Sequence, residues 1–184
     1  TEDGAPIPRS AGLPYAPKNL PDRIVLTPGA DPAREMAVAF RTDTAQAEAQ
    51  APLAVSVDGP TLAEKAKLVG GTSMPVDSSY GRALYHQVRF TGLTPDTVYA
   101  YRLKGAAGWS EWHQFRTAAA EAKPFRFLYL GDIQNGILTY ASRVIRQAFH
   151  ANGDIRLVVH AGDLVGQRDD LDHDDDWGEW NQAG

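Results

Sequence analysis

Residues 125–132 read Phe-Arg-Phe-Leu-Tyr-Leu-Gly-Asp, and residues 155–163 read Ile-Arg-Leu-Val-Val-His-Ala-Gly-Asp. Each stretch is an almost continuous apolar run, which is typical of a strand buried on both faces of a parallel sheet. Between the two runs, apolar residues recur at helical spacing at Leu138, Ala141, Ile145, Ala148 and Phe149, and Asn152-Gly153 follows as a stop signal. The pattern of strand, helix and strand predicts one βαβ unit.

Both apolar runs end in the same dipeptide, Gly131-Asp132 in the first and Gly162-Asp163 in the second. In a parallel sheet the carboxyl ends of neighbouring strands face one crevice, where ligands bind. Two carboxylates in that crevice repel each other unless a cation lies between them, and hard oxygen ligands suit divalent or trivalent ions. A single Gly-Asp is explained as a cap of the next element, but the matched pair predicts that Asp132 and Asp163 bind metal.

The region from residue 23 to residue 117 has a different pattern. About seven short β-rich runs are separated by turn residues such as Pro28-Gly29 and Asp58-Gly59-Pro60, without a convincing helix. This spacing predicts a β-sandwich. The following aromatic residues fall at strand-period positions and are predicted to form its core: Phe40, Tyr85, Phe90, Tyr99, Tyr101 and Phe115.

The chain is predicted to divide into three parts. Residues 1–22 contain five prolines and are expected to form an extended leader. The small and polar stretch 117–124 is a predicted boundary between a sandwich domain at 23–118 and an α/β domain that starts at 124.

Composition excludes several classes of protein. The chain has 184 residues, no cysteine and a formal net charge of −5, so thiolate metal sites and disulfide scaffolds are excluded. No apolar run is long enough for a membrane span, and the acidity argues against a nucleic-acid partner. The excess negative charge comes from one segment, 169–179, which holds Asp169, Asp170, Asp172, Asp174, Asp175, Asp176 and Glu179.

Several stretches of the sequence resemble known protein families. Phe-Leu-Tyr-Leu-Gly-Asp-Ile-Gln-Asn (127–135) and Leu-Val-Val-His-Ala-Gly-Asp-Leu-Val (157–165) resemble the first two motifs of the calcineurin-like metallophosphoesterases. Met-Ala-Val-Ala-Phe-Arg-Thr (36–42) and Leu-Thr-Pro-Asp-Thr-Val-Tyr-Ala-Tyr-Arg-Leu (93–103) resemble the fibronectin-III-like N-terminal domain of purple acid phosphatases. The expected fold is therefore a fibronectin III/Ig-like β-sandwich, followed by the first βαβ unit of an α/β metallophosphoesterase domain at 124–184.

The resemblance implies a metal-dependent phosphoester hydrolase with two divalent or trivalent metal ions, which are Fe, Zn or Mn. Asp132 would hold one metal, and Asp163 would bridge both. A metal-bound hydroxide would attack the phosphorus of the phosphoester substrate. The resemblance also implies a secreted or periplasmic protein.

Two positions depart from the family pattern. Gly166 stands where purple acid phosphatases have a tyrosine that binds iron, so a ferric tyrosinate site is not expected. Gln134 stands where many relatives have a histidine. Gln134 and Asn135 are candidate contacts for a metal or for phosphate.

The later motifs of the family, Gly-Asn-His and Gly-His-x-His, do not occur in this sequence. The five histidines do not replace them and are interpreted as structural or solvated: His86, His113, His150, His160 and His173. The expectation is an N-terminal portion of a longer enzyme that is inactive alone. The alternative is a secreted fibronectin-III-like binding module that carries a degenerate, non-catalytic phosphoesterase relic.

Overall fold

The computed structural model describes residues 14–56, 59, 61–166 and 174–184, and the chain divides into two compact units. The first, called the sheet unit, comprises Pro17–Asp77 and Gly81–Lys123. The second, called the βαβ unit, comprises Pro124–Gly184, together with Ser78–Tyr80 and, among the described N-terminal residues, 14–16. Most of the predicted leader and of the acidic segment lies outside the described residues, at 1–13 and 167–173.

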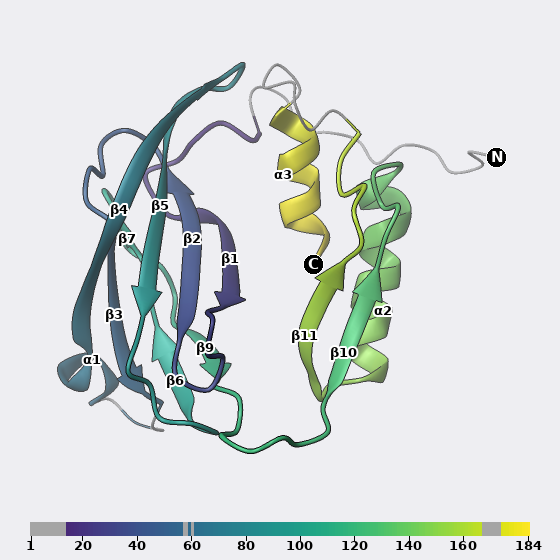
Figure 1. The fold of residues 1–184 in the computed structure, drawn as a ribbon. Coiled ribbons are helices and arrows are strands. Elements are labelled where there is room, and N and C mark those ends of the chain that lie inside the picture. The colour runs from purple at the N-terminus through teal and green to yellow at the C-terminus, as the bar shows by residue number, and fades with distance from the viewer. Residues whose placement is uncertain (1–13, 57–58, 60, 167–173) are drawn as a thin grey trace. The chain divides into compact units, whose positions relative to one another are not determined.

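The sheet unit contains one seven-stranded sheet, in the order β1-β2-β5-β4-β3-β6-β9 (Figure 1). Its strands are β1 (Asp22–Pro28), β2 (Met36–Thr42), β3 (Gln50–Val55), β4 (Lys67–Ser78), β5 (Gly81–Phe90), β6 (Val98–Tyr101) and β9 (His113–Arg116). A two-stranded ribbon, β7 (Lys104–Gly105) and β8 (Gly108–Trp109), and a short helix, α1 (Leu62–Lys65), complete the unit. The pairs β1–β2, β2–β5, β3–β4, β3–β6 and β6–β9 are antiparallel.

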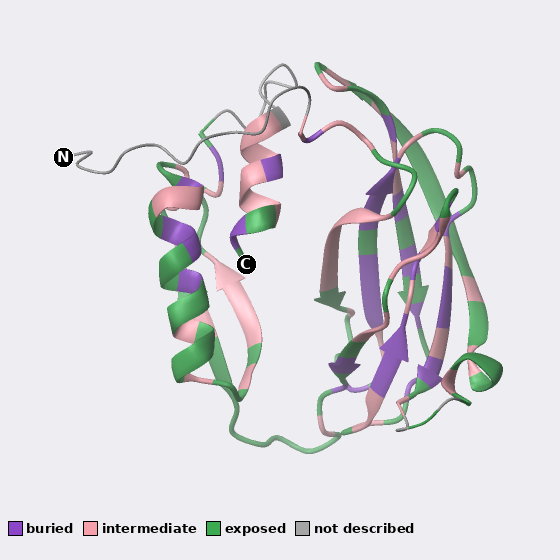
Figure 2. Cartoon of the chain, turned by 180° about the vertical axis from the view of Figure 1, so that it is seen from behind, coloured by how far each residue is buried: buried purple, intermediate pink, exposed green. Residues whose placement is uncertain are grey.

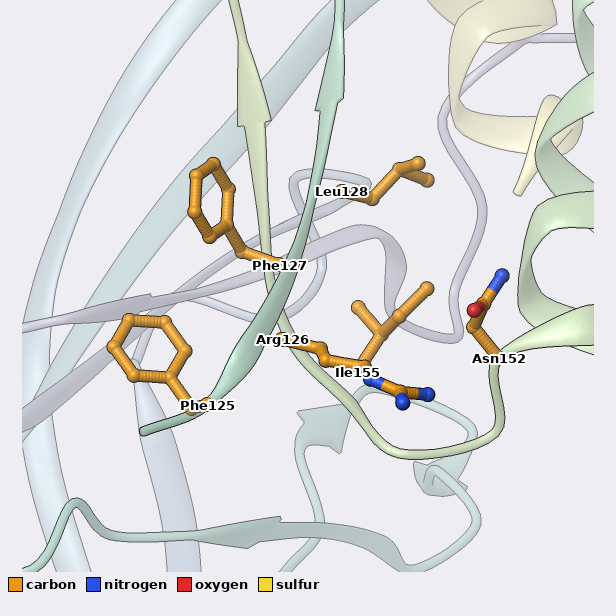
Figure 3. Close-up of a pocket in the computed structure, with 6 residues that line it drawn as sticks. All are labelled: Phe125, Arg126, Phe127, Leu128, Asn152 and Ile155. Carbon is orange, nitrogen blue, oxygen red and sulfur yellow. The ribbon is translucent and has the colours of Figure 1, made fainter. Parts of the chain in front are cut away.

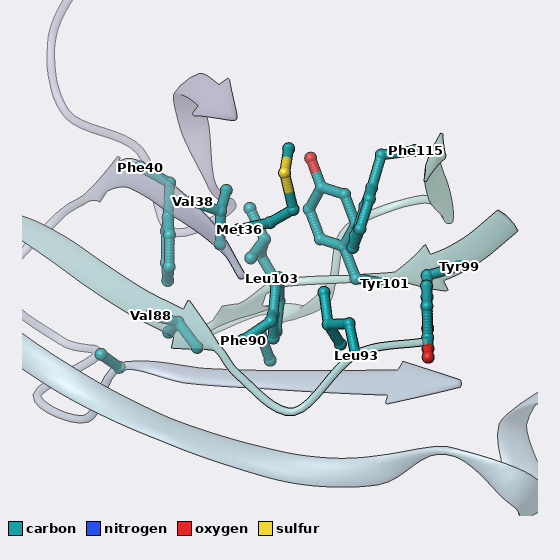
Figure 4. Packing of buried hydrophobic residues seen from close by; sticks show 12 residues of the cluster. Met36, Val38, Phe40, Val88, Phe90, Leu93, Tyr99, Tyr101, Leu103 and Phe115 are labelled. Atoms are coloured by element: carbon teal, nitrogen blue, oxygen red, sulfur yellow. The ribbon is translucent and has the colours of Figure 1, made fainter. Parts of the chain in front are cut away.

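One apolar core holds the sheet unit together, and the two halves of the sheet both contribute to it. Val38 and Phe40 on β2 are buried with Phe90 on β5, and they share a cluster with Tyr99 and Phe115 from β6 and β9 (Figure 4). The Tyr99 and Phe115 rings are stacked, with centroids 5.6 Å apart. The prediction of a sandwich-like, mostly antiparallel β domain is therefore confirmed.

β4 is a long strand of 12 residues, although it contains Gly70, Gly71 and Pro75, which are typical of turns. Most of its residues are exposed, so it has no apolar alternation that would mark it as a strand (Figure 2). Its pairing with β3 and β5 joins the two halves of the sheet.

The βαβ unit follows the predicted order of elements. β10 (Arg126–Leu130) and β11 (Ile155–His160) pair in parallel, and η1 (Ile137–Ala141) and α2 (Ser142–Ala151) lie between them in the chain. The last helix, α3 (Asp174–Ala183), places Trp177 and Trp180 against a small apolar cluster. The buried members of this cluster are Ile137, Ile145, Val165 and Ala183. None of the helices in the described part of the chain has the length and apolar character needed to cross a membrane.

The expectation that the first strand is buried on both faces is wrong for β10. On one face of the strand, Leu130 joins the apolar cluster that includes helix residues. The other face is open in the described residues: Phe125, Phe127 and Tyr129 are 60%, 55% and 66% exposed. The reason is that burial on both faces of a parallel sheet requires a helix layer on each side.

Candidate metal centre

The two motif aspartates follow strand ends that lie on the same rung of the parallel pair. Leu130, the last residue of β10, is the register partner of His160, the last residue of β11. The backbone N–H of Ala161 also donates to the Leu130 carbonyl oxygen, at 2.6 Å. Asp132 and Asp163 therefore leave the sheet at the same edge, as the pattern of the sequence predicts.

Both aspartates have a left-handed backbone, with φ of 54° at Asp132 and 50° at Asp163. Positive φ is uncommon outside glycine, although aspartate tolerates it better than most residues. Only Arg23 and Asp96 share it among the other described non-glycine residues. Backbone strain of this kind concentrates at functional sites, so its occurrence at both motif positions supports a functional role.

The glycines that precede the two aspartates differ from each other. Gly162 has a φ of 98°, whereas Gly131 does not have a positive φ. At Gly131 the constraint is space, because a Cβ atom there would lie 3.3 Å from the Cβ of Ala161. A larger residue at 131 would press the two strand exits apart.

Gln134 connects the two loops. Its Nε2 donates to Oδ2 of Asp163, at 3.5 Å, so the residue that follows the first strand contacts the carboxylate that follows the second. Its Oε1 is buried and has no hydrogen-bond partner among the described residues. Asn135 is exposed beside it. The sequence identified Gln134 as a candidate contact, but only the structure shows that it holds Asp163.

These residues fit part of a metal centre. Asp132 and Asp163 offer exposed carboxylate oxygens, and Gln134 offers an amide oxygen that lacks a donor. Such oxygens are the ligands of hard cations. Within the described residues, however, no group of three or more His, Cys, Asp or Glu side chains comes together, so those residues supply only part of a ligand set.

Two further side chains lie near the candidate centre, Asp176 and His160. The Asp176 carboxylate lies 3.6 Å from the position that a Cβ atom would take at Gly166. His160 packs edge-on against Trp180, with ring centroids 5.3 Å apart, and burial lowers its pKa. The structural interpretation of His160 is therefore supported by its packing, although its Nδ1 has no partner among the described residues.

A cleft of about 310 Å³ lies at the opposite end of the strand pair (Figure 3). Its lining includes Phe125, Phe127 and Ile155, which lie at or near the beginnings of β10 and β11. It contains no carboxylate, so it does not take part in the metal centre.

Comparisons with known proteins give independent information on the fold. At 19% identity and a TM-score of 0.53, a solved structure of PhoD matches 86% of this chain. The match covers 29% of the PhoD chain, so this chain spans less than a third of that protein. This likeness shows a shared fold.

Two further solved structures resemble this chain more weakly. A computationally redesigned β-sandwich protein matches 55% of this chain and 96% of its own, with 17% identity and a TM-score of 0.36. The sensor domain of the anti-sigma factor RsgI4 from Pseudobacteroides cellulosolvens matches 53% of this chain and 94% of its own, with 13% identity and a TM-score of 0.34. A search of curated protein sequences found no significant match.

The family comparison concerns the sheet unit. The model of the purple acid phosphatase N-terminal domain matches residues 21–117, more than half of the chain. Those residues span β1 to β9. The chain belongs to the family of the purple acid phosphatase N-terminal domain.

Proposed function

We propose that this chain is part of a metal-dependent phosphoester hydrolase, in which residues 124–184 begin a calcineurin-like metallophosphoesterase domain. The observation that carries the proposal is the matched geometry of Asp132 and Asp163, which follow neighbouring parallel strands and share a left-handed backbone. The family of the sheet unit supports the same reaction class.

In this proposal Asp132 and Asp163 would be the metal ligands that this chain supplies. The two oxygens of the Asp163 carboxylate would allow it to serve more than one cation. Gln134 donates a long hydrogen bond to Oδ2 of Asp163, at 3.5 Å, and so lies beside that carboxylate. When bound, such a metal pair supplies activation of water and neutralisation of charge on the phosphoryl oxygens.

The residues of this chain bind and orient in this reaction, and none is proposed as a covalent nucleophile. Two carboxylates and one amide do not complete a binuclear centre, so further ligands must come from outside the described residues. The chain alone is therefore proposed to be inactive, with the activity belonging to the parent protein.

The test is hydrolysis of p-nitrophenyl phosphate by the parent protein with added Mn²⁺ or Zn²⁺. Asp163→Asn is expected to abolish metal-dependent turnover, and Asp154→Asn is the matched control, because Asp154 lies in the turn before β11 and pairs with Arg126. Undiminished activity of Asp163→Asn would refute the bridging role. Absence of any metal-dependent hydrolysis in the parent would favour a binding module with a relic phosphoesterase domain.

A further inference from the structure

The outer face of the sheet unit carries a row of alternating indole and basic side chains. The guanidinium carbon of Arg102 lies 5.0 Å from the ring centroid of Trp109 and 4.8 Å from that of Trp112. The ammonium nitrogen of Lys104 lies 4.8 Å from the Trp109 ring. All four side chains are partly exposed. These four residues are called the Trp–Arg ladder.

The alternation of side chains along residues 101–104 and the pairing of β7 with β8 bring the four ladder residues together. Tyr101 and Leu103 point into the core, so the alternate residues Arg102 and Lys104 point to the outer face. Lys104 is the register partner of Trp109 in the β7–β8 ribbon. The Ser110 hydroxyl oxygen also accepts a hydrogen bond from the Leu103 backbone, at 3.0 Å, which fixes the chain between the two tryptophans.

The two cations of the ladder have no anionic partner among the described residues. Indole rings attract a cation but accept no hydrogen bond in the plane of a guanidinium. The Nε of Arg102 is buried and has no hydrogen-bond partner in the part of the chain that the structure describes. The two acidic residues closest to these cations in the sequence have other partners: Asp96 pairs with Arg116 and Lys123, and the Glu111 carboxylate lies 3.9 Å from Nε2 of His113. The ladder therefore holds a fixed guanidinium and a nearby ammonium whose hydrogen-bonding capacity is unused.

We propose that the Trp–Arg ladder binds a phosphate group, either free or carried by a larger ester. A guanidinium matches the geometry of a phosphate by donating two parallel hydrogen bonds, and the flat indoles hold Arg102 ready for it. Lys104 adds a second positive charge on the same face. This site lies in the sheet unit, so it does not depend on Asp132, Asp163 or the proposed hydrolase activity.

The test is a titration of the 184-residue chain, followed by side-chain ¹H–¹⁵N NMR. Inorganic phosphate and glucose 6-phosphate are added in separate arms, with chloride at matched ionic strength as the control. The expected result is a saturable shift of the Arg102 Nε–H signal and of the Trp109 and Trp112 indole signals, with Trp177 and Trp180 unchanged. Saturation at a markedly lower concentration of glucose 6-phosphate would assign the ester as the ligand, and similar values would assign free phosphate.

Variants distinguish phosphate binding at the ladder from a nonspecific effect of positive surface charge. Arg102→Gln is expected to weaken binding about tenfold or more. Lys104→Gln keeps the Arg102 contacts with both indoles and is expected to weaken binding about threefold. Lys67→Gln, which removes an exposed lysine of β4, is expected to leave phosphate binding unchanged. Shifts no larger than those with chloride, or shifts that persist unchanged in Lys104→Gln and in a folded Arg102→Gln, would overturn the proposal and leave the ladder as a structural element.

Discussion

At the scale of single residues, the sheet unit depends on a buried charge. The Arg41 side chain is only 2% exposed, and its partner Asp22 is 28% exposed. Two hydrogen bonds of 2.8 and 2.7 Å join the guanidinium to the two oxygens of the carboxylate. Because Asp22 and Arg41 are also register partners of β1 and β2, the pair fixes the edge strand to the sheet.

Removal of the carboxylate would take from the buried Arg41 side chain both hydrogen bonds that join it to Asp22. Asp22→Ala is expected to lower the free energy of unfolding by about 3 kcal/mol, since breaking a buried ion pair by removing one member is strongly destabilising. The measurement is urea denaturation. The matched control is Asp77→Ala, which breaks the exposed Asp77–Arg82 pair and is expected to cause no measurable change. Equal effects of the two substitutions would contradict this account.

His86 makes stability depend on pH. It is buried between the Thr42 and Ser73 hydroxyls, each 2.8 Å from one of its ring nitrogens, and its ring stacks on Phe40. Thr42 donates its own hydrogen to the Asp43 carbonyl oxygen, so Nε2 of His86 donates to Thr42 and Nδ1 accepts from Ser73. Burial lowers the pKa of His86 because it penalises the charged form.

The sign of the pH effect follows from that shift. The unfolded chain binds a proton at this histidine below about pH 6.5, whereas the folded chain binds it only at lower pH. The full stability is therefore expected above pH 6.5, and it should fall as the pH drops from there toward the folded-state pKa. A histidine NMR titration checks this directly, and His86→Gln should flatten the dependence of the urea midpoint on pH. A pKa of His86 in the folded chain above that of a histidine in a model peptide would refute this pH dependence.

At the scale of the elements, two adjacent glycines in β4 have different roles. A Cβ atom at Gly71 would collide with the backbone carbonyl of Gln87, whereas one at Gly70 would meet nothing within 4 Å. Gly71→Ala is therefore expected to lower the free energy of unfolding by about 2–3 kcal/mol, because the strands must separate to accommodate it. Gly70→Ala serves as the control and should change it by less than about 0.5 kcal/mol. Thermal unfolding of both variants tests the close approach, and similar melting temperatures would count against it.

The sequence predicted the elements best where one periodicity dominated. β10, α2 and β11 were recognisable from apolar runs and helical spacing, and the strands of the core from their alternating residues. β4 was not, because its glycines, its proline and its exposure on both faces remove the pattern on which such predictions depend. The open face of β10 was missed for the opposite reason, since an apolar run does not show how many faces are covered.

The candidate centre was predictable in part. The sequence placed Asp132 and Asp163 at matching strand ends, and the register of β10 and β11 agrees with that placement. Their left-handed backbone and the contact from Gln134 to Asp163 depend on how the loops fold and had no signal in the sequence. The Trp–Arg ladder was also missed, although Arg102 and Lys104 alternate with core residues along the strand.

At the scale of the whole molecule, the sheet unit belongs to the family of the purple acid phosphatase N-terminal domain. The described residues of the βαβ unit present two carboxylates but not a complete ligand set. With added Mn²⁺, the 184-residue chain is expected to hydrolyse p-nitrophenyl phosphate no faster than its Asp163→Asn variant. The comparison is made by initial rates at equal protein concentration. A clear excess for the unmodified chain would show that the missing ligands are present after all.

The central claim is that Asp132 and Asp163 bind metal together, and paramagnetic NMR tests it most directly. Mn²⁺ added at low ratio to the ¹⁵N-labelled chain should broaden the backbone signals of residues 131–135 and 162–164 first. Both Asp132→Asn and Asp163→Asn should remove that broadening, while Asp154→Asn should retain it. Broadening confined to the acidic segment 169–179, or unchanged in the two variants, would contradict the claim.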